Sequence, residues 1–204
     1  MSQLEFSPPR LTMKERQRQL REEAILDAAV DFIQTKGFDA MTLEDITESI
    51  GISRPTLYQH FSSKEDMVVH VAMRNLLRGV EKLRELDDTK RPALERLVEF
   101  LDWAMLSRFG SCRSIFTDLG NLILAAKEKN EKYRSASAEF KERFRNLIRA
   151  AQESGEVRCD ICPALLSEAV MSIYKSPGFD ELVQKGEVDL SEIRDCIYKL
   201  LQHG

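Results

Sequence analysis

Helix-breaking residues are scarce in this chain, and most of them stand between segments with helical periodicity. Nine glycines and six prolines occur among the 204 residues, roughly 7% against an average usage nearer 12%. Pro92 and Pro163 stand where helices can begin, because the first helical position needs no N–H partner. Gly37 and Gly51 stand where helices can end with a positive φ. No segment keeps a two-residue alternation for long, so the sequence predicts an all-α fold.

The apolar periodicity divides the chain into a polar arm, up to about residue 18, and a series of helices. The expected helices span residues 19–36, 43–50, 54–61, 63–86, 92–109, 112–128, 131–154, 163–175 and 190–202.

Composition excludes several classes of protein. With 43% hydrophobic residues, the chain can bury a core, and its length fits one or two domains of roughly 100 to 200 residues each. No uncharged apolar run approaches the roughly 18 residues that a membrane span needs. The N-terminus lacks the charged-then-apolar layout of a signal peptide, and four cysteines are too few for a disulfide scaffold. We therefore expect a cytoplasmic protein with no membrane partner.

Two short expected helices are joined by a three-residue turn. Thr42 can cap the helix at 43–50, and Asp45 stands at the N3 position of a capping box. Gly51 can end that helix, and Ser53 can cap the next one. Two short helices joined in this way make a helix-turn-helix, whose second member can enter the major groove of DNA.

The second helix of this motif carries side chains that suit a DNA surface. Leu57 and Phe61 are spaced to face the core. The side chains left on or near the exposed face are Arg54, Thr56, Tyr58, Gln59 and His60. Guanidinium, hydroxyl and amide groups can bind phosphates or base edges, and a helix N-terminus attracts phosphate. A short polar surface helix, capped only for stability, would show the same spacing.

Residues 24–66 closely resemble the N-terminal domain of TetR/AcrR-type transcriptional regulators. The resemblance rests on the blocks Ile25-Leu26-Asp27-Ala28-Ala29, Lys36-Gly37-Phe38, Thr42-Leu43-Glu44-Asp45-Ile46 and Gly51-Ile52-Ser53-Arg54-Pro55-Thr56-Leu57-Tyr58-Gln59-His60-Phe61-Ser62-Ser63-Lys64-Glu65. It covers about a fifth of the chain, and the later residues fit the family only in length and helix count. The resemblance implies a basic arm at 1–18, a helix-turn-helix DNA-binding domain at 19–66 and a ligand-binding and dimerisation domain at 67–204.

The resemblance also implies which residues contact DNA. These are Thr42, Ser53, Arg54, Pro55, Thr56, Tyr58, His60 and Lys64. Residues 54–56 match positions that meet the groove, whereas the others serve as caps or backbone contacts. Two residues depart from the family pattern: Thr47 replaces the usual Ala where the two motif helices cross, and Pro55 replaces a Gly or Ala and can touch a thymine methyl. We expect a slightly wider crossing at Thr47.

The net charge of −4 argues weakly against a nucleic-acid partner, but the charge is unevenly distributed. Residues 1–21 hold five basic side chains and two acidic ones, and residues 53–64 hold two basic ones and no acid, whereas residues 22–52 are strongly acidic. The positive charge therefore lies on the arm and the recognition helix. Either the arm touches nothing, or Arg16, Arg18 or Arg21 reaches the DNA backbone or minor groove.

Large apolar side chains are frequent beyond residue 66, and most of them are expected to form a core. The resemblance implies a ligand cavity among them, for which we expect Trp103, Phe116 and Phe140 as lining residues. Because this region holds no unbalanced charged cluster, we expect a mainly apolar ligand.

The last two expected helices carry apolar stripes, which can be buried within the chain or pair with a second copy. The resemblance implies a homodimer through Leu166, Val170, Ile173, Ile193, Ile197 and Leu200. Such a dimer would set two recognition helices roughly 34 to 36 Å apart.

Cys159 and Cys162 form a CxxC pair. A structural zinc site needs four ligands, and no second pair is present, so we expect an ordinary turn without a metal. A redox role for the two thiols remains the alternative.

Together these features predict a ligand-responsive dimeric regulator, with repression favoured over activation. Its expected partners are a double-stranded palindromic operator, a small-molecule effector and a second copy of the chain. No spacing supplies convergent catalytic groups, so we expect neither enzyme activity nor a cofactor. The rival hypothesis is a redox-responsive regulator or a helical interaction module acting through Cys159 and Cys162.

Overall fold

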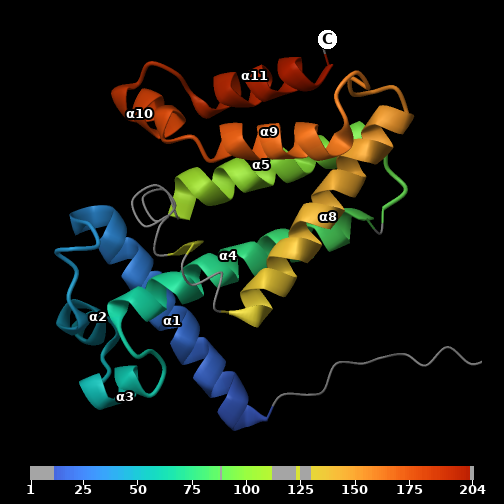
Figure 1. The fold of residues 1–204 in the computed structure, drawn as a ribbon. Helices are drawn as coiled ribbons and strands as arrows, with labels where there is room; N and C mark the ends of the chain where they lie inside the picture. Colours follow the sequence, from blue (N-terminus) through green and yellow to red (C-terminus); the bar gives the residue numbers. More distant parts are fainter. Residues whose placement is uncertain (1–11, 88, 112–122, 125–129, 203–204) are drawn as a thin grey trace, which may run out of the picture.

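The computed structural model describes residues 12–87, 89–111, 123, 124 and 130–202. All regular structure in this part of the chain is α-helical, which confirms the predicted fold class. Figure 1 shows two groups of helices joined by one long helix.

The first group contains α1 (Met13–Lys36), α2 (Leu43–Ile50) and α3 (Arg54–Tyr58). Their buried faces share one apolar core, which includes Ile25, Ile46 and Leu57, all fully buried. The first half of α4 (Lys64–Asp87) completes this core with Met67 and Val71. The long helix α1 and the two short helices α2 and α3 thus share a core with the first half of α4.

The second group contains α5 (Ala93–Ser111), α8 (Glu131–Glu153), α9 (Pro163–Tyr174), α10 (Pro177–Lys185) and α11 (Leu190–Gln202). In Figure 1, α8 crosses α4, while α9 and α11 lie over α5 and α8. Phe100 of α5 and Phe144 of α8 are buried at the centre, with ring centroids 5.3 Å apart.

Two helix boundaries differ clearly from the prediction. Helix α1 begins at Met13 and not at residue 19, because Thr12 and Glu15 form a capping box that starts the helix earlier. Helix α3 ends at Tyr58 and not at residue 61, because the amides of Gln59 and His60 bond to the carbonyls of Thr56 and Leu57 in a tightened last turn.

Helix α10 was not predicted, because Pro177 beside Gly178 is typical of a turn. Pro177 begins the helix, and Gly186 ends it in the left-handed conformation with φ of 69°. The predicted helix at 112–128 lies outside the described residues, apart from residues 123 and 124. None of the described helices has the length and apolar content needed to cross a membrane.

Candidate functional site

The start of α2 is organised by the capping box that the sequence predicts. The hydroxyl of Thr42 donates to Asp45 Oδ2 at 2.6 Å, the Thr42 amide donates to the same oxygen at 2.7 Å, and the Asp45 amide donates back to the hydroxyl at 3.2 Å. The ammonium of Lys36 also pairs with this carboxylate. Hydrogen bonds from Lys36 and Thr42 lower the pKa of Asp45 from 3.8 to about 2. The carboxylate therefore stays ionised and holds the end of α1 against the start of α2.

The turn between α2 and α3 orients the recognition helix. Gly51 adopts φ of 68° in the left-handed region, and Ser53 caps α3 by accepting the Thr56 amide at 3.3 Å. The hydroxyls of Ser53 and Thr56 are 2.8 Å apart. Pro55 and Tyr58 are exposed, and Tyr58 keeps 54% of its surface accessible. An exposed phenol at the end of a capped helix is available to a phosphate.

Arg54 also lies on the exposed side of α3, but it is not isolated. Its guanidinium pairs with the carboxylate of Glu44 on α2, and both side chains are about half exposed. Exposed pairs of this kind contribute only about 0 to 1 kcal/mol. The Arg54 guanidinium can therefore exchange Glu44 for another acceptor at low cost. No sequence pattern indicated this pair, because its members belong to different helices.

His60 contradicts the expectation that its side chain faces outward. Only 4% of the side chain is exposed, and Nδ1 lies 3.1 Å from Oε1 of Glu22 on α1. Because α3 ends at Tyr58, the chain turns before His60, and the ring packs against α1. The predicted position of this side chain on the DNA face is therefore wrong.

Lys64 stands at the start of α4, and its ammonium points toward the loop that follows α1. Nζ donates to the carbonyl oxygens of Phe38 and Asp39 at 3.1 and 3.3 Å and lies 4.5 Å from the centre of the Phe38 ring. These bonds occupy two of its three N–H donors. Lys64 thus ties α4 to the loop after α1.

The predicted basic arm is partly helical. Arg16, Arg18 and Arg21 are exposed on the N-terminal half of α1, and Arg18 forms a 2.9 Å ion pair with Glu22. Residues 1–11 lie outside the described residues.

Thr47, at the crossing of α2 and α3, is buried and donates its hydroxyl to the Glu44 carbonyl at 3.0 Å. Its polar group is thereby satisfied within its own helix.

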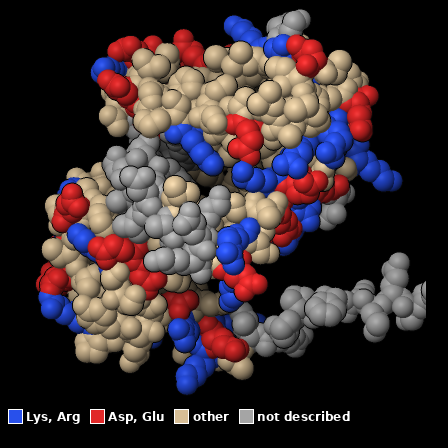
Figure 2. Space-filling model, viewed as in Figure 1, with Lys and Arg blue, Asp and Glu red and all other residues tan. Residues whose placement is uncertain are grey.

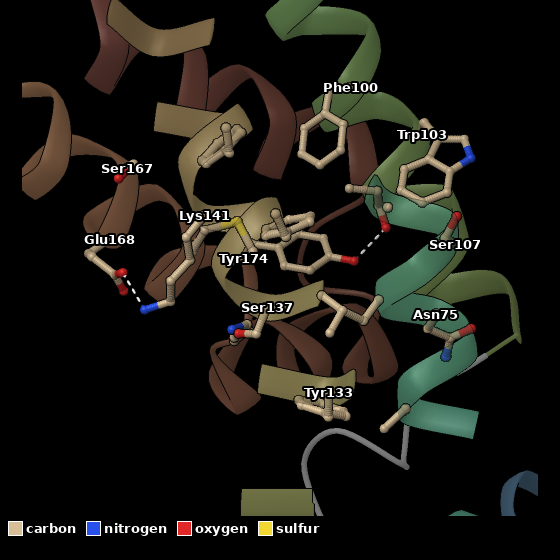
Figure 3. Close-up of a pocket in the computed structure, with 18 residues that line it drawn as sticks. Asn75, Phe100, Trp103, Ser107, Tyr133, Ser137, Lys141, Ser167, Glu168 and Tyr174 are labelled. Carbon is tan, nitrogen blue, oxygen red and sulfur yellow. Dashed lines mark hydrogen bonds and ion pairs between the residues drawn. The ribbon is translucent and has the colours of Figure 1, made fainter. Parts of the chain in front are cut away.

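A cavity of about 240 Å³ lies between α4, α5, α8 and α9. Figure 3 shows its lining, with Phe100 and Trp103 on one wall and Lys141 and Glu168 on the opposite side. Trp103 and Phe140 line it, as the sequence analysis expected for a ligand cavity. Phe116, the third expected residue, lies outside the described residues. The ligand role of all three stays a prediction.

The sequence did not predict the polar side chains that border this cavity. The Tyr174 hydroxyl donates to the Ala104 carbonyl at 2.6 Å, and Lys141 Nζ lies 2.7 Å from Glu168 Oε1. Asn75 and Ser137 also border the space. These residues come from four helices, so no spacing along the chain could have grouped them.

Helix α4 belongs to both the DNA-binding core and the cavity. The guanidinium of Arg74 is 9% exposed and lies 2.8 Å from both Glu23 and Asp27 of α1. Within the next two turns of α4, Leu76 and Gly79 line the cavity. A Cβ atom on Gly79 would stand 3.0 Å from Cε2 of the Phe140 ring, so the glycine allows the close approach of α8.

The expected dimer residues prove to be mostly internal. Leu166, Val170, Ile193 and Ile197 are buried in the core of their own chain, so the prediction that they form a surface between two chains is wrong. Ile173 is partly buried against the same core. Of the six, Leu200 alone is exposed, at 46%. These stripes pack on α5 and α8, the internal alternative that the periodicity left open.

The exposed side of α9 and α11 is a different surface. Leu165 of α9 and Leu200 of α11 are exposed, at 63% and 46%. In Figure 2, the front of this upper layer is mostly uncharged, with charged side chains gathered at its edges. A largely uncharged front makes this layer the candidate for a contact surface.

Cys159 and Cys162 are exposed in the turn before α9. Cys162 precedes Pro163 as the N-cap residue and forms no side-chain cap bond. No group of three or more His, Cys, Asp or Glu side chains among the described residues could hold a metal ion.

Comparison with known proteins agrees with this architecture. The profile of the family "Bacterial regulatory proteins, tetR family" matches residues 25–71. The chain is 30% identical to the HTH-type transcriptional repressor KstR2 of Rhodococcus jostii over 147 residues, which cover 69% of this chain and 70% of that protein. It is 36% identical to the HTH-type transcriptional activator FasR of Mycolicibacterium smegmatis over 92 residues, which span only 42% of either protein.

A solved structure has the same fold. The fatty acid degradation regulator FadR of Bacillus halodurans superimposes with a TM-score of 0.70 at 19% identity, covering 90% of this chain and 95% of that one. This chain belongs to the TetR family of transcriptional regulators. Members of the family are DNA-binding regulators and not enzymes.

Proposed function

We propose that this chain is a ligand-responsive repressor, which binds a palindromic operator as a homodimer and leaves it when a small, mainly apolar molecule occupies the cavity. The observation that carries the proposal is the double role of α4. Arg74 ties α4 to α1 of the DNA-binding core, and Leu76 and Gly79 of the same helix line the cavity. A shift of the cavity wall thus reaches the DNA-binding helices through one continuous element.

The exposed side of α3 supplies the contacts to the operator. Arg54 exchanges Glu44 for a guanine or a phosphate, and Pro55 touches a thymine methyl. Tyr58 and the hydroxyls at the start of α3 hold backbone phosphates. Lys64 can add a phosphate contact through the third N–H of its ammonium, and Thr42 can add one if its hydroxyl exchanges Asp45 for a phosphate. His60 supports α3 from behind through Glu22.

The longer alignment with a repressor favours repression over activation. KstR2 is a repressor and FasR an activator, so membership of the family is compatible with both. The alignment with KstR2 runs over 69% of this chain, against 42% for FasR.

Release from DNA follows when the ligand shifts the protein from its DNA-bound conformation to its DNA-free conformation. A ligand changes the DNA affinity only if it binds the DNA-free conformation more tightly than the DNA-bound one. The cavity meets this requirement if its volume changes when α4 moves, because the ligand then stabilises one position of that helix.

Binding to DNA upstream of the protein's own gene tests the first part of the proposal. Arg54→Ala should weaken binding of a fluorescent fragment by roughly tenfold or more, since a specific base contact is worth about 1 to 3 kcal/mol. Arg91→Ala is the matched control, because Arg91 pairs with Glu95 and Glu99 of α5, outside the DNA-binding core. Equal affinities for the two variants would refute the assignment of α3 as the recognition helix.

The exposed side of α9 and α11 is the proposed dimer surface, and a charge placed on it tests this proposal. Leu200→Glu should shift the sedimenting species from dimer to monomer and weaken operator binding, because two half-sites can then no longer be bound together. Leu77→Glu is the control, since Leu77 is exposed to a similar extent, 50%, but lies on α4. A Leu200→Glu protein that stays dimeric would exclude this face.

A further inference from the structure

The walls and the mouth of the cavity differ in chemistry. Phe100 lies 5.9 Å from both Trp103 and Phe140, so three rings form one continuous apolar wall. Charged side chains gather at the opposite side in Figure 3, where Lys141 of α8 meets Glu168 of α9. A ligand that fills the space therefore needs an apolar body and one polar end.

The ion pair at the mouth is loosely held. The side chains of Lys141 and Glu168 are 48% and 55% exposed, so both remain partly solvated. Exposed pairs are worth about 0 to 1 kcal/mol. A ligand group of the right charge can take the place of either member without leaving a buried charge unpaired.

Several cationic side chains act on the carboxylate of Glu168. The hydrogen bond from Lys141 and the charges of Lys175 and Arg145 lower the pKa of Glu168. Arg145 is also paired with Glu142 at 3.1 Å. Three cationic side chains thus stabilise a negative charge at the position of the Glu168 carboxylate, so a ligand anion that takes this position is stabilised in the same way.

We infer that the effector is an amphipathic monocarboxylate, whose carboxylate binds Lys141 in place of Glu168 and whose apolar body lies along the wall of Phe100, Trp103 and Phe140. This inference rests on the proposed function and specifies its ligand. Ser137, one turn before Lys141 on α8, also borders the cavity and can donate to the second carboxylate oxygen.

The cavity volume limits the size of the ligand. About 240 Å³ equals roughly eight water volumes of about 30 Å³ each, enough for roughly eight to ten non-hydrogen atoms. Octanoate has this size. Octan-1-ol and octylammonium have a chain of the same number of carbon atoms with a neutral and a cationic end, and they serve as matched probes.

Calorimetric titration of the full-length protein with the three probes tests the inference. Octanoate should bind at least tenfold more tightly than the other two. Lys141→Gln should bring octanoate close to the affinity of octan-1-ol, whereas Glu168→Gln should raise octanoate affinity several-fold, because it removes the competing carboxylate. Lys185→Gln, which breaks a similar exposed pair with Glu181 on α10, is the control and should change nothing.

Three results would overturn the inference: no binding of octanoate, equal or tighter binding of octylammonium, or weaker octanoate binding by Glu168→Gln. The opposite signs expected for the two cavity variants separate ligand recognition from a loss of folding. Operator binding is measured on the same samples. If the protein binds octanoate but no operator, the proposed function fails while the ligand class stands.

Discussion

Replacing Tyr58 by phenylalanine is expected to weaken operator binding by roughly 30-fold and to leave the stability of the fold unchanged. The phenol is 54% exposed at the end of α3. Loss of one hydroxyl-to-phosphate bond is worth about 1 kcal/mol net. A symmetric dimer loses two such bonds, about 2 kcal/mol, and each 1.4 kcal/mol is tenfold in affinity.

His60→Ala should lower the stability of the fold and leave operator affinity almost unchanged. Its side chain is 4% exposed and lies 3.1 Å from Glu22, so the variant loses a hydrogen bond to a partly solvated carboxylate and some ring packing. We expect a loss of about 2 kcal/mol in the free energy of unfolding. At this chain length, that lowers the melting temperature by roughly 4 to 8 °C.

Fluorescence anisotropy with a labelled upstream fragment measures affinity, and differential scanning calorimetry measures the melting temperature. Tyr58→Phe should change only the affinity. His60→Ala should lower the melting temperature and bind the operator almost normally well below its transition. The reasoning fails if Tyr58→Phe binds like the wild type, or if His60→Ala loses as much affinity with an unchanged melting temperature.

Other substitutions and modifications address the core, the cap of α2 and the CxxC pair. Phe144→Ala should reduce the free energy of unfolding by about 3 to 5 kcal/mol, because the ring is fully buried; an unchanged urea midpoint would contradict this. The pKa of Asp45 is lowered to about 2 by Lys36 and the cap, so its carboxylate stabilises the fold above pH 3.8, and this contribution disappears as the pH falls through about 2. The stability gap between wild type and Asp45→Asn should therefore shrink from pH 5 to pH 2, as urea titrations would show; a constant gap would be inconsistent with the lowered pKa. Alkylation of the exposed Cys159 and Cys162 should change operator affinity by no more than about twofold, and a large loss would favour the redox-responsive alternative.

Features that depend on neighbouring residues were predictable from the sequence. The capping box of Thr42 and Asp45 and the left-handed Gly51 appear at the expected positions. Each arises from interactions within a few residues, so the local pattern specifies it. The fold class and the helix-turn-helix followed from such signals.

The direction of individual side chains depended on distant parts of the chain. His60 turns toward Glu22, which is 38 residues away, and Lys64 bonds to the loop carbonyls 25 and 26 residues away. The helical stripe that contains Val170 has the same period whether it faces its own core or a second chain. Periodicity identifies a buried face but not the surface that covers it.

The sequence by itself therefore determined the helices, their caps and the recognition motif, because those features follow from short-range hydrogen bonding and apolar spacing. Only the tertiary structure decided which stripes are internal and which polar groups meet at the cavity. Lys141 and Glu168 lie 27 residues apart on different helices, and only the packing of α8 against α9 brings their charges together at one opening. The chemistry of that opening is a property of the fold and not of any local pattern.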